Sequence, residues 1–312
     1  MITQRTLARE VHTKGVGLHT GQEVDLTIRP GEADAGIVFR RSDLPSSSQV
    51  AANADNVVDT QLATTLGEAG VRVSTVEHLM ATFAGLGIDN AQVEVGGSEL
   101  PIMDGSAAPF VRLIRSAGIE EQAAPKRFIE ITREVRWTDG LAFTSLTPHD
   151  GFRLDYTMKY DHPYFEGLCQ HARVDFSSRA FIRDISRART FGFLADIERL
   201  RAMDLVRGGS LANAVVVDDD GVVNDEGLRY EDEFAKHKIL DAIGDLYVAG
   251  HSIIGAFTGY QSGHASNNAL VRELLADPAS FRSVTFENGC QPPINLYRAW
   301  NGAQANGTPR SP

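Results

Sequence analysis

The sequence predicts an α+β protein that consists of two similar layered sandwich domains with the functional site between them. The length of 312 residues favours about two domains. Short alternating apolar stretches, which are typical of strands, are interleaved with longer amphipathic stretches, which are typical of helices. The chain therefore has the elements of layered sheets and helices rather than of an all-helical or all-strand fold.

The two halves of the chain also resemble each other. His78 lies seven residues before Gly85, and His237 lies seven residues before Gly244. Each histidine is followed by a glycine turn, an apolar strand, a glycine-bearing loop and an amphipathic helix. We interpret this shared order as a duplicated unit with a site where the two copies face each other. The alternative is a chance likeness between two ordinary helix–strand units.

The composition excludes several classes of protein. Hydrophobic residues make up 42% and charged residues 23% of the chain, which is typical of a globular protein with a sizeable core. No run of about 18 apolar residues occurs, so we expect no membrane-spanning segment. The net charge of −11 argues against a nucleic-acid partner, because phosphate binding needs clustered lysine and arginine.

We expect the protein to be cytoplasmic. The first residues, Met1–Arg5, lack the basic and then apolar pattern of a secretory signal. There are two cysteines, Cys169 and Cys290, which form neither a disulfide framework nor a CxxC metal motif and suit a reducing compartment.

The first domain is predicted to span residues 1–124. Its strands are expected where apolar residues alternate or cluster, at 24–28, 36–39 and 91–95. A helix is expected to begin near Ser74 and to end at about residue 84, because a Ser or Thr cap with Glu77 three residues later is typical of a helix start. A second helix is expected at 107–116.

The second domain is predicted to span residues 125–290 and to follow a small, polar linker at 122–126 that contains a proline. Strands are expected at 128–135, 141–147, 152–159 and 252–257, and helices at 231–249 and 269–275. Residues 291–312 are rich in Asn, Gly and Pro and are expected to form a loose tail.

One short segment carries the first chemical signal. His237 and Asp241 are four residues apart, so a helix places an imidazole and a carboxylate on one face. His78, in the other domain, is a candidate third ligand. Two histidines and one carboxylate, with an open fourth position, are typical of a catalytic zinc site. The alternatives are a capping or surface histidine and a solvated His–Asp pair.

Further residues fit acid–base roles beside such a metal. Glu77 directly precedes His78 and so lies about 100° around the helix, where it can act as a base without being a ligand. His264 starts a helix in a glycine-flanked loop and can protonate a departing amine. Asp245, one turn beyond Asp241, would favour the charged form of His264, whereas the positive end of its helix would oppose that form.

Longer motifs agree with this pattern, in order from near the N-terminus to about residue 290. They are Val11–His19, Ser74–Leu79, Leu86–Asn90, Arg187–Phe193, Asp232–Leu246 and Ser262–Ala265. In these motifs the sequence resembles the UDP-3-O-acyl-N-acetylglucosamine deacetylases, the metal-dependent enzymes of the committed step of lipid A (lipopolysaccharide) synthesis.

The resemblance implies site roles that agree with those argued from residue types. His78, His237 and Asp241 would be the metal ligands, Glu77 the general base and His264 the general acid. The resemblance further implies that Thr190 stabilises the oxyanion, which fits a donor that faces the metal. Lys238 and Asp245 fall at further site positions of the family.

The resemblance also implies a pair of α+β sandwich domains, each with a small insert. The second insert would be a β-α-β element at about 192–221 that forms a tunnel for an acyl chain. Its residues at tunnel-lining positions are Leu194, Ile197, Val206, Ala214 and Val216. The alternative is that these apolar side chains only pack a core.

Other candidate substrate contacts come from aromatic and basic side chains. Tyr160, Phe191 and Phe193 either contact the nucleotide or sugar or pack in the core. Arginines at helical intervals either meet a diphosphate or form a solvated helix face: Arg179, Arg183, Arg187 and Arg189. The sequence departs from the family at Gln261, where lysine is frequent, so diphosphate binding is expected to depend more on Lys238.

The prediction is a zinc-dependent deacetylase, with Fe²⁺ as the alternative metal, that converts a UDP-3-O-acyl-N-acetylglucosamine into the free amine and acetate. A metal-activated water would attack the amide. The expected partner is this small molecule alone, and the expected state is a monomer. The competing hypotheses are an iron oxygenase with the same ligand types and a non-catalytic sugar-nucleotide binder, and an acid–base pair favours hydrolysis over both.

Overall fold

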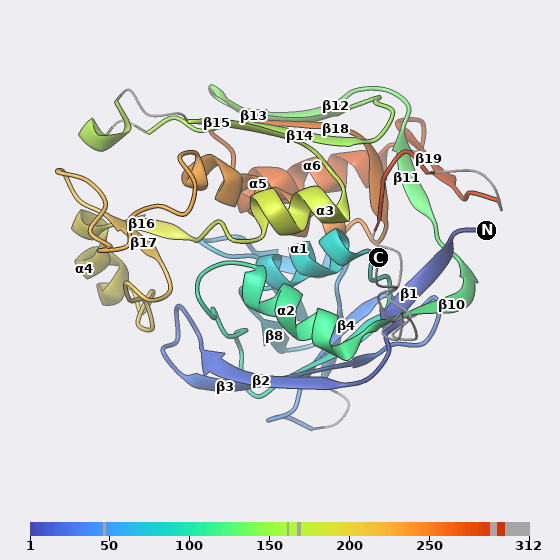
Figure 1. Cartoon of the computed structure of the whole chain (residues 1–312), viewed down its shortest axis with the longest axis horizontal. Helices are drawn as coiled ribbons and strands as arrows, with labels where there is room; N and C mark the ends of the chain where they lie inside the picture. The colour runs from blue at the N-terminus through green and yellow to red at the C-terminus, as the bar shows by residue number, and fades with distance from the viewer. Residues whose placement is uncertain (46–47, 161, 167–169, 288–291, 297–312) are drawn as a thin grey trace, which may run out of the picture.

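The computed structural model describes residues 1–45, 48–160, 162–166, 170–287 and 292–296. It confirms the α+β class. Figure 1 shows two sheets that form a lower and an upper layer, with helices packed between them. The division of the chain at residues 124 and 125 and the duplication of one unit stay predictions.

The lower sheet contains the strands predicted in the first half. Its order is β2 (Val11–Val16), β3 (Glu23–Pro30), β9 (Ala91–Val95), β4 (Ile37–Arg41) and β5 (Gln49–Ala51). Along β3, Val24, Leu26 and Ile28 are buried while Glu23 and Asp25 are exposed, which is the alternation of a half-buried strand. The predicted strands 24–28, 36–39 and 91–95 correspond to β3, β4 and β9.

Smaller sheets complete this half. One contains β6 (Val57–Asp59), β7 (Thr65–Glu68) and β8 (Val71–Val73), after the short turn η1 (Ala54–Asn56). In another, β1 (Thr3–Leu7) pairs antiparallel with β10 (Ile119–Pro125). The segment predicted as a linker, 122–126, therefore lies mostly in a strand, with its proline, which has no N–H to donate, at the strand end.

Helix α1 (Glu77–Leu86) lacks the predicted serine or threonine cap. The residue before it is Val76, and no side chain caps the first turn. The Thr75 hydroxyl instead donates to Glu99 (3.1 Å), and the Ser74 hydroxyl lies 2.9 Å from that of Thr65. Both hydroxyls are therefore engaged outside the helix.

Glycines end the two helices of this half. α1 stops at Gly87, whose φ of +72° is a left-handed conformation that glycine adopts without strain. α2 (Ala108–Ala117) has a proline in its first turn and stops at Gly118. The helix predicted at 107–116 is confirmed.

The upper sheet has the order β12 (Val135–Asp139), β13 (Ala142–Thr147), β18 (Ser252–Tyr260), β11 (Phe128–Ile131) and β19 (Phe281–Val284), and β14 (Phe152–Thr157) joins β18 to β15 (His171–Asp175). The strand predicted at 128–135 is thus two strands. The chain leaves the ladder at Thr132, whose backbone N–H donates to the Ser280 carbonyl (2.8 Å).

Helices of the second half fill the space under this sheet. α5 (Glu233–Tyr247) lies within the predicted 231–249, and α6 (His264–Ala276) begins five residues before the predicted 269. The short α3 (Ser178–Ala180) continues into one wide turn, η3 (Phe181–Ile185), and η2 (Pro163–Phe165) follows β14.

A β-α-β element projects at one end of the molecule, on the left of Figure 1. It consists of β16 (Phe191–Phe193), α4 (Leu194–Ala202) and β17 (Val215–Val217), and the two strands pair in parallel. Apart from Phe191, these elements fall in the stretch predicted as an insert, about 192–221.

A close approach of α1 and α5 brings the two halves together. A Cβ atom on Gly244 would lie 2.0 Å from the carbonyl oxygen of Glu77, so only glycine allows this spacing. At Gly85, its counterpart in the predicted repeat, an added Cβ atom would lie 2.1 Å from the Phe181 ring. The glycines that the repeat singles out therefore lie where helices pack.

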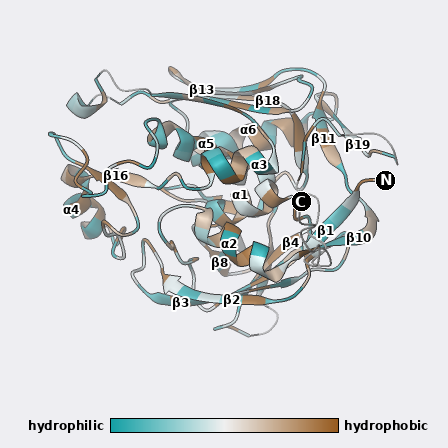
Figure 2. Ribbon diagram, in the orientation of Figure 1, coloured by the Kyte–Doolittle hydropathy of each residue, from teal (hydrophilic) through white to brown (hydrophobic). Residues whose placement is uncertain are grey.

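Apolar side chains of both layers form one continuous core. Figure 2 shows apolar residues in brown on the helices between the sheets. Large side chains that are fully buried include Phe39, Phe83, Phe110, Phe128 and Phe257. No helix of the described residues is long and apolar enough to cross a membrane.

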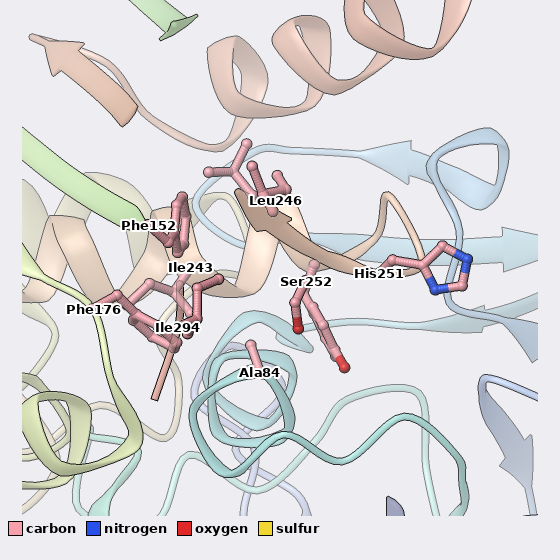
Figure 3. Close-up of a pocket in the computed structure, with 10 residues that line it drawn as sticks. Ala84, Phe152, Phe176, Ile243, Leu246, His251, Ser252 and Ile294 are labelled. Carbon is pink, nitrogen blue, oxygen red and sulfur yellow. The ribbon is translucent and has the colours of Figure 1, made fainter. Parts of the chain in front are cut away.

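The last described segment, 292–296, packs against this core. Figure 3 shows Ile294 in a small apolar pocket beside Phe152, Phe176 and Ile243, and the Ile294 side chain is 1% exposed. The rest of the tail predicted at 291–312 lies outside the described residues, as do Cys169 and Cys290.

Candidate metal centre and active site

Three candidate ligands converge from the two facing helices. His78 lies in the first turn of α1, and His237 and Asp241 lie one turn apart on α5. The Nε2 atoms of His78 and His237 lie 3.6 and 3.3 Å from Asp241 Oδ1, and one ligand atom from each residue lies within 4.8 Å of the others. All three side chains are buried.

The atoms that face one another are suited to a cation. His237 Nδ1 donates to the Ala188 carbonyl (3.0 Å), and burial lowers the pKa of His237 to about 3, so its Nε2 carries a lone pair. Among the described residues, no hydrogen-bond donor reaches Asp241 Oδ1. A lone pair and a carboxylate oxygen therefore face each other in a buried space, which is unfavourable unless a positive charge lies between them.

Asp241 stays ionised despite its burial. Burial raises its pKa, but His237 and Lys238 outweigh this effect, so the pKa of Asp241 lies well below its usual value. Lys238 Nζ donates to Asp241 Oδ2 (2.9 Å), which leaves Oδ1 for a metal. Burial lowers the pKa of Lys238, but the charge of Asp241 raises this pKa by more than burial lowers it. Lys238 is therefore charged.

Glu77 lies beside the three ligands. Glu77 is 3% exposed, and its carboxylate accepts a hydrogen bond from the backbone N–H of Thr64 (3.0 Å). Burial raises the pKa of Glu77. A carboxylate with a raised pKa next to a metal centre is suited to accept a proton near neutral pH.

His264 and Asp245 form a hydrogen-bonded pair opposite Glu77. His264 Nδ1 lies 2.8 Å from Asp245 Oδ2, which also accepts from Asn267 (2.9 Å), and Asp245 Oδ1 accepts from the Thr64 hydroxyl (2.6 Å). Burial lowers the pKa of His264, but the charge and hydrogen bond of Asp245, with Glu77, raise it to about 9. The ring is therefore charged at neutral pH.

These residues open onto one cavity of about 390 Å³. The predicted residues that line it are Glu77, His78, Tyr160, Thr190, Phe191, His237, Lys238, Asp241 and His264, together with Gln261. Asp245 lies behind His264 and not in the lining. The cavity therefore joins side chains from both halves of the chain.

The other predicted substrate contacts belong to the β16–α4–β17 element and its connection, outside this lining. Phe193 packs against Tyr160, with ring centroids 5.3 Å apart. Leu194 is 48% exposed and Val216 is buried. The remaining tunnel candidates, Ile197, Val206 and Ala214, are partly buried.

The arginine run is neither one helical face nor one cluster. Arg183 pairs with the neighbouring Asp184, and the Arg187 guanidinium lies 5.9 Å from the centre of the Tyr230 ring. Arg189 is buried against Glu233. The spacing of the arginines does not place them on one helical face, because the helix there ends at Ile185, before Arg187 and Arg189.

Some residues at the site carry little signal in the sequence. Leu18, Thr60, Leu62, Thr75 and Ile102 line the cavity, and His19 is buried nearby with an Nε2 atom that has no hydrogen-bond partner among the described residues. Leu18 and His19 belong to a motif that the family resemblance includes, whereas Thr64 and Asn267 stand in no recognisable pattern.

Comparison with known proteins agrees with this site. A family model described as LpxC, UDP-3-O-acyl N-acetylglycosamine deacetylase, matches residues 4–276. Three curated relatives are each called UDP-3-O-acyl-N-acetylglucosamine deacetylase. The protein of Nitrosococcus oceani is 57% identical over 92% of this chain and 95% of its own length. Those of Pseudomonas entomophila and Hahella chejuensis are 55% and 54% identical, over 96% of this chain and 98% and 99% of their own lengths.

The fold, the site and these matches define a deacetylase. The chain belongs to the LpxC family, the UDP-3-O-acyl-N-acetylglucosamine deacetylases.

Proposed function

We propose that the protein hydrolyses the N-acetyl group of a UDP-3-O-acyl-N-acetylglucosamine and releases acetate, as a step of lipid A synthesis. The observation that carries this proposal is the convergence of His78, His237 and Asp241 beside Glu77 and His264. The names of the relatives supply the substrate class.

In the proposed reaction, water adds to the amide carbonyl and the C–N bond then breaks. Glu77 takes a proton from the attacking water, and His264 gives one to the departing nitrogen, because an amide anion is a poor leaving group. Thr190 donates a hydrogen bond to the oxyanion that forms between the two steps. Asp245 keeps the His264 ring oriented and charged.

His78, His237 and Asp241 would hold a divalent metal, which when bound makes water a better nucleophile and polarises a carbonyl. We propose Zn²⁺ because two imidazoles and one carboxylate are a frequent catalytic zinc set. Fe²⁺ accepts the same ligands and is the alternative.

The rest of the substrate would extend from the cavity in two directions. Lys238, Tyr160, Phe191 and Phe193 would contact the diphosphate, sugar or nucleotide. The acyl chain would lie along the β16–α4–β17 element, against its tunnel candidates Leu194, Ile197, Val206, Ala214 and Val216. We expect the protein to act as a cytoplasmic monomer.

The test is acetate release from a UDP-3-O-acyl-N-acetylglucosamine by protein stripped of metal and reloaded with Zn²⁺ or Fe²⁺. We expect one acetate and one free amine for each turnover with metal, and none after chelation. Oxygen consumption without acetate release would favour an iron oxygenase, and tight binding without turnover would favour a sugar-nucleotide binder.

A further inference from the structure

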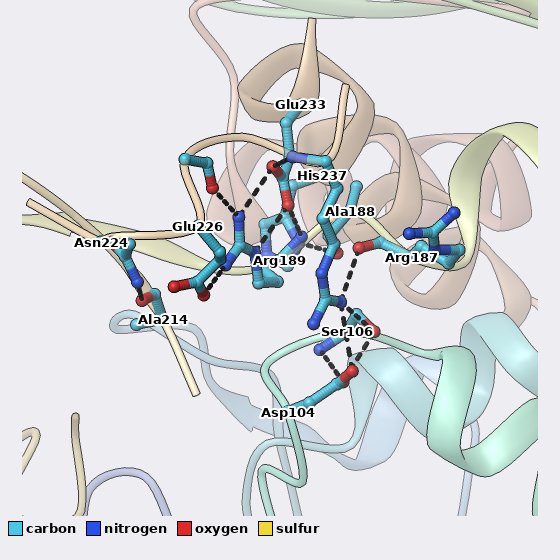
Figure 4. Close-up of polar contacts among 12 residues, drawn as sticks. Asp104, Ser106, Arg187, Ala188, Arg189, Ala214, Asn224, Glu226, Glu233 and His237 are labelled. Carbon is cyan, nitrogen blue, oxygen red and sulfur yellow. Dashed lines mark hydrogen bonds and ion pairs between the residues drawn. The ribbon is translucent and has the colours of Figure 1, made fainter. Parts of the chain in front are cut away.

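A buried ion pair lies behind the candidate metal centre, and the proposed reaction does not use it. Arg189 and Glu233 are 1% and 0% exposed. Arg189 Nε donates to Glu233 Oε1 (2.9 Å) and Nη2 donates to Oε2 (3.2 Å), as Figure 4 shows. Nη1 donates to Glu226 (2.7 Å), and Nη2 also donates to the Gly227 carbonyl (2.7 Å).

Stability alone does not explain such a pair. Removing two charges from water is costly, and apolar side chains of similar volume often stabilise a fold as well or better. Here the carboxylate also accepts two backbone N–H groups, those of Arg189 (3.0 Å) and Arg229 (2.6 Å). The pair therefore fixes the course of the backbone at residues that apolar packing would leave free to shift.

The backbone that the pair fixes carries groups of the site. Glu233 lies four residues before His237, so consecutive turns of α5 bind consecutive residues of the same segment. Glu233 accepts from the N–H of Arg189, and His237 donates to the carbonyl of Ala188. The backbone N–H of Thr190, the next residue, donates to the Gly105 carbonyl (2.8 Å), and Thr190 lines the cavity.

We propose that Arg189 and Glu233 form a positioning pair, which fixes the Ala188 carbonyl and thereby the ring of His237, and which holds Thr190 toward the cavity. A carbonyl at Nδ1 directs the lone pair of His237 Nε2 toward Asp241 and His78. Partners of this kind typically contribute 10–100-fold to metal affinity. The inference rests on the proposed function, since it takes His237 as a metal ligand.

The same cluster reaches the half of the chain that supplies His78. Arg229, whose backbone N–H donates to Glu233, contacts Asp104 (3.1 Å) and the Ser106 hydroxyl (3.4 Å), and donates to the Arg187 carbonyl (3.0 Å). The cluster thus spans both halves of the chain.

The test compares Arg189→Met, Glu233→Gln and Arg189→Lys with the wild type. The readouts are the Zn²⁺ dissociation constant from competition with a chromophoric chelator, the melting temperature of the metal-free protein, and kcat and KM at saturating Zn²⁺. We expect Arg189→Met and Glu233→Gln to weaken Zn²⁺ binding by about 10–100-fold and to lower kcat with little change in KM. Arg189→Lys keeps the charge but loses the paired N–H donors of the guanidinium. Its Zn²⁺ affinity and kcat should therefore lie between those of the other two variants and those of the wild type.

Lys126→Met is the matched control. Lys126 is 0% exposed and is paired with Asp89, away from the cavity lining. The Lys126→Met substitution should lower the melting temperature without changing Zn²⁺ affinity. The inference is wrong if Arg189→Met and Glu233→Gln behave like this control. If Arg189→Met does not fold, Glu233→Gln decides, because glutamine keeps the shape of the side chain and removes its charge and one acceptor oxygen. A wild type that binds no Zn²⁺ would instead refute the proposed function.

Discussion

At the residue scale, the two ring nitrogens of His237 have different neighbours. Its Nδ1 donates to a carbonyl, and its Nε2 faces Asp241 and the His78 ring. The i,i+4 spacing on a helix predicts that His237 and Asp241 share a face, and this holds in α5. The pattern does not predict which ring nitrogen faces the carboxylate, because that depends on Ala188, which lies far away in the sequence.

The proposed acid and base can be separated from the ligands by mutation. Glu77→Ala and His264→Ala should each lower kcat by about 10²–10⁴-fold while the protein still binds metal, because neither side chain belongs to the proposed ligand set. Acetate release and metal content after dialysis measure the two properties. His237→Ala is the control and should lose metal. Near-full turnover of either variant would contradict the acid–base assignment.

The charge of His264 should depend on Asp245. In metal-free protein the His264 ring should titrate with a pKa of about 9, and Asp245→Asn should lower this pKa because it removes the attracting charge. An NMR titration, with His264→Ala to assign the signal, measures the shift. An unchanged pKa in Asp245→Asn would show that the carboxylate does not set the charge.

This titration also has a consequence for stability. The folded pKa of His264 exceeds the unfolded value of about 6.5. The charged ring therefore contributes its full stabilisation below about pH 6.5, and this contribution is lost as the pH rises through about 9.

At the scale of elements, periodicity predicts the long helices and the half-buried strands well, and predicts helix starts and edge strands poorly. β3, β9 and α5 have strong apolar patterns. The start of α1 is different because Thr75, with φ of +59°, binds Glu99 rather than the helix. The small, polar residues at 122–126 predict a linker, and only the pairing of β10 with β1 makes most of this segment a strand.

The contact of α1 with α5 provides a test at this scale. Alanine is favoured over glycine in a helix by about 1 kcal/mol, but a Cβ at Gly244 would meet the Glu77 carbonyl at 2.0 Å. Gly244→Ala should therefore lower the melting temperature and, by moving α1 from α5, weaken Zn²⁺ binding.

Gly97→Ala is the control for this substitution. Its Cβ would meet only a Val24 methyl group, at 3.4 Å. A Gly244→Ala protein that is as stable as the wild type and binds Zn²⁺ equally well would mean that the close helix approach does not set the site.

At the scale of the whole molecule, the helices between the two sheets share one core, and the segment 292–296 packs onto it. The Ile294 side chain lines a small apolar pocket together with Ala84 of α1, Ile243 of α5 and Phe152 of β14 (Figure 3). This segment therefore touches elements from both halves of the chain, on a pocket separate from the cavity of the candidate site.

Ile294→Ala should destabilise the protein by about 2–5 kcal/mol, the usual range for such a truncation in a core. Deacetylation per folded molecule should stay unchanged, because Ile294 does not line the cavity. Thermal or urea unfolding and acetate release measure the two effects. Leu141→Ala, at a side chain that is 82% exposed, should change stability by no more than about 0.5 kcal/mol. Equal stability of the two variants would show that the segment does not support the core.

The sequence by itself determined the α+β class, the family and the residue types of the candidate site, because periodicity and long motifs are local properties of the chain. The tertiary structure decided how these residues meet. Gly244 permits the helix contact that brings His78 to Asp241, Thr64 joins Glu77 to Asp245, and the Arg189–Glu233 pair supports His237 from behind. Each of these contacts joins residues distant in the sequence, so no local pattern could predict it.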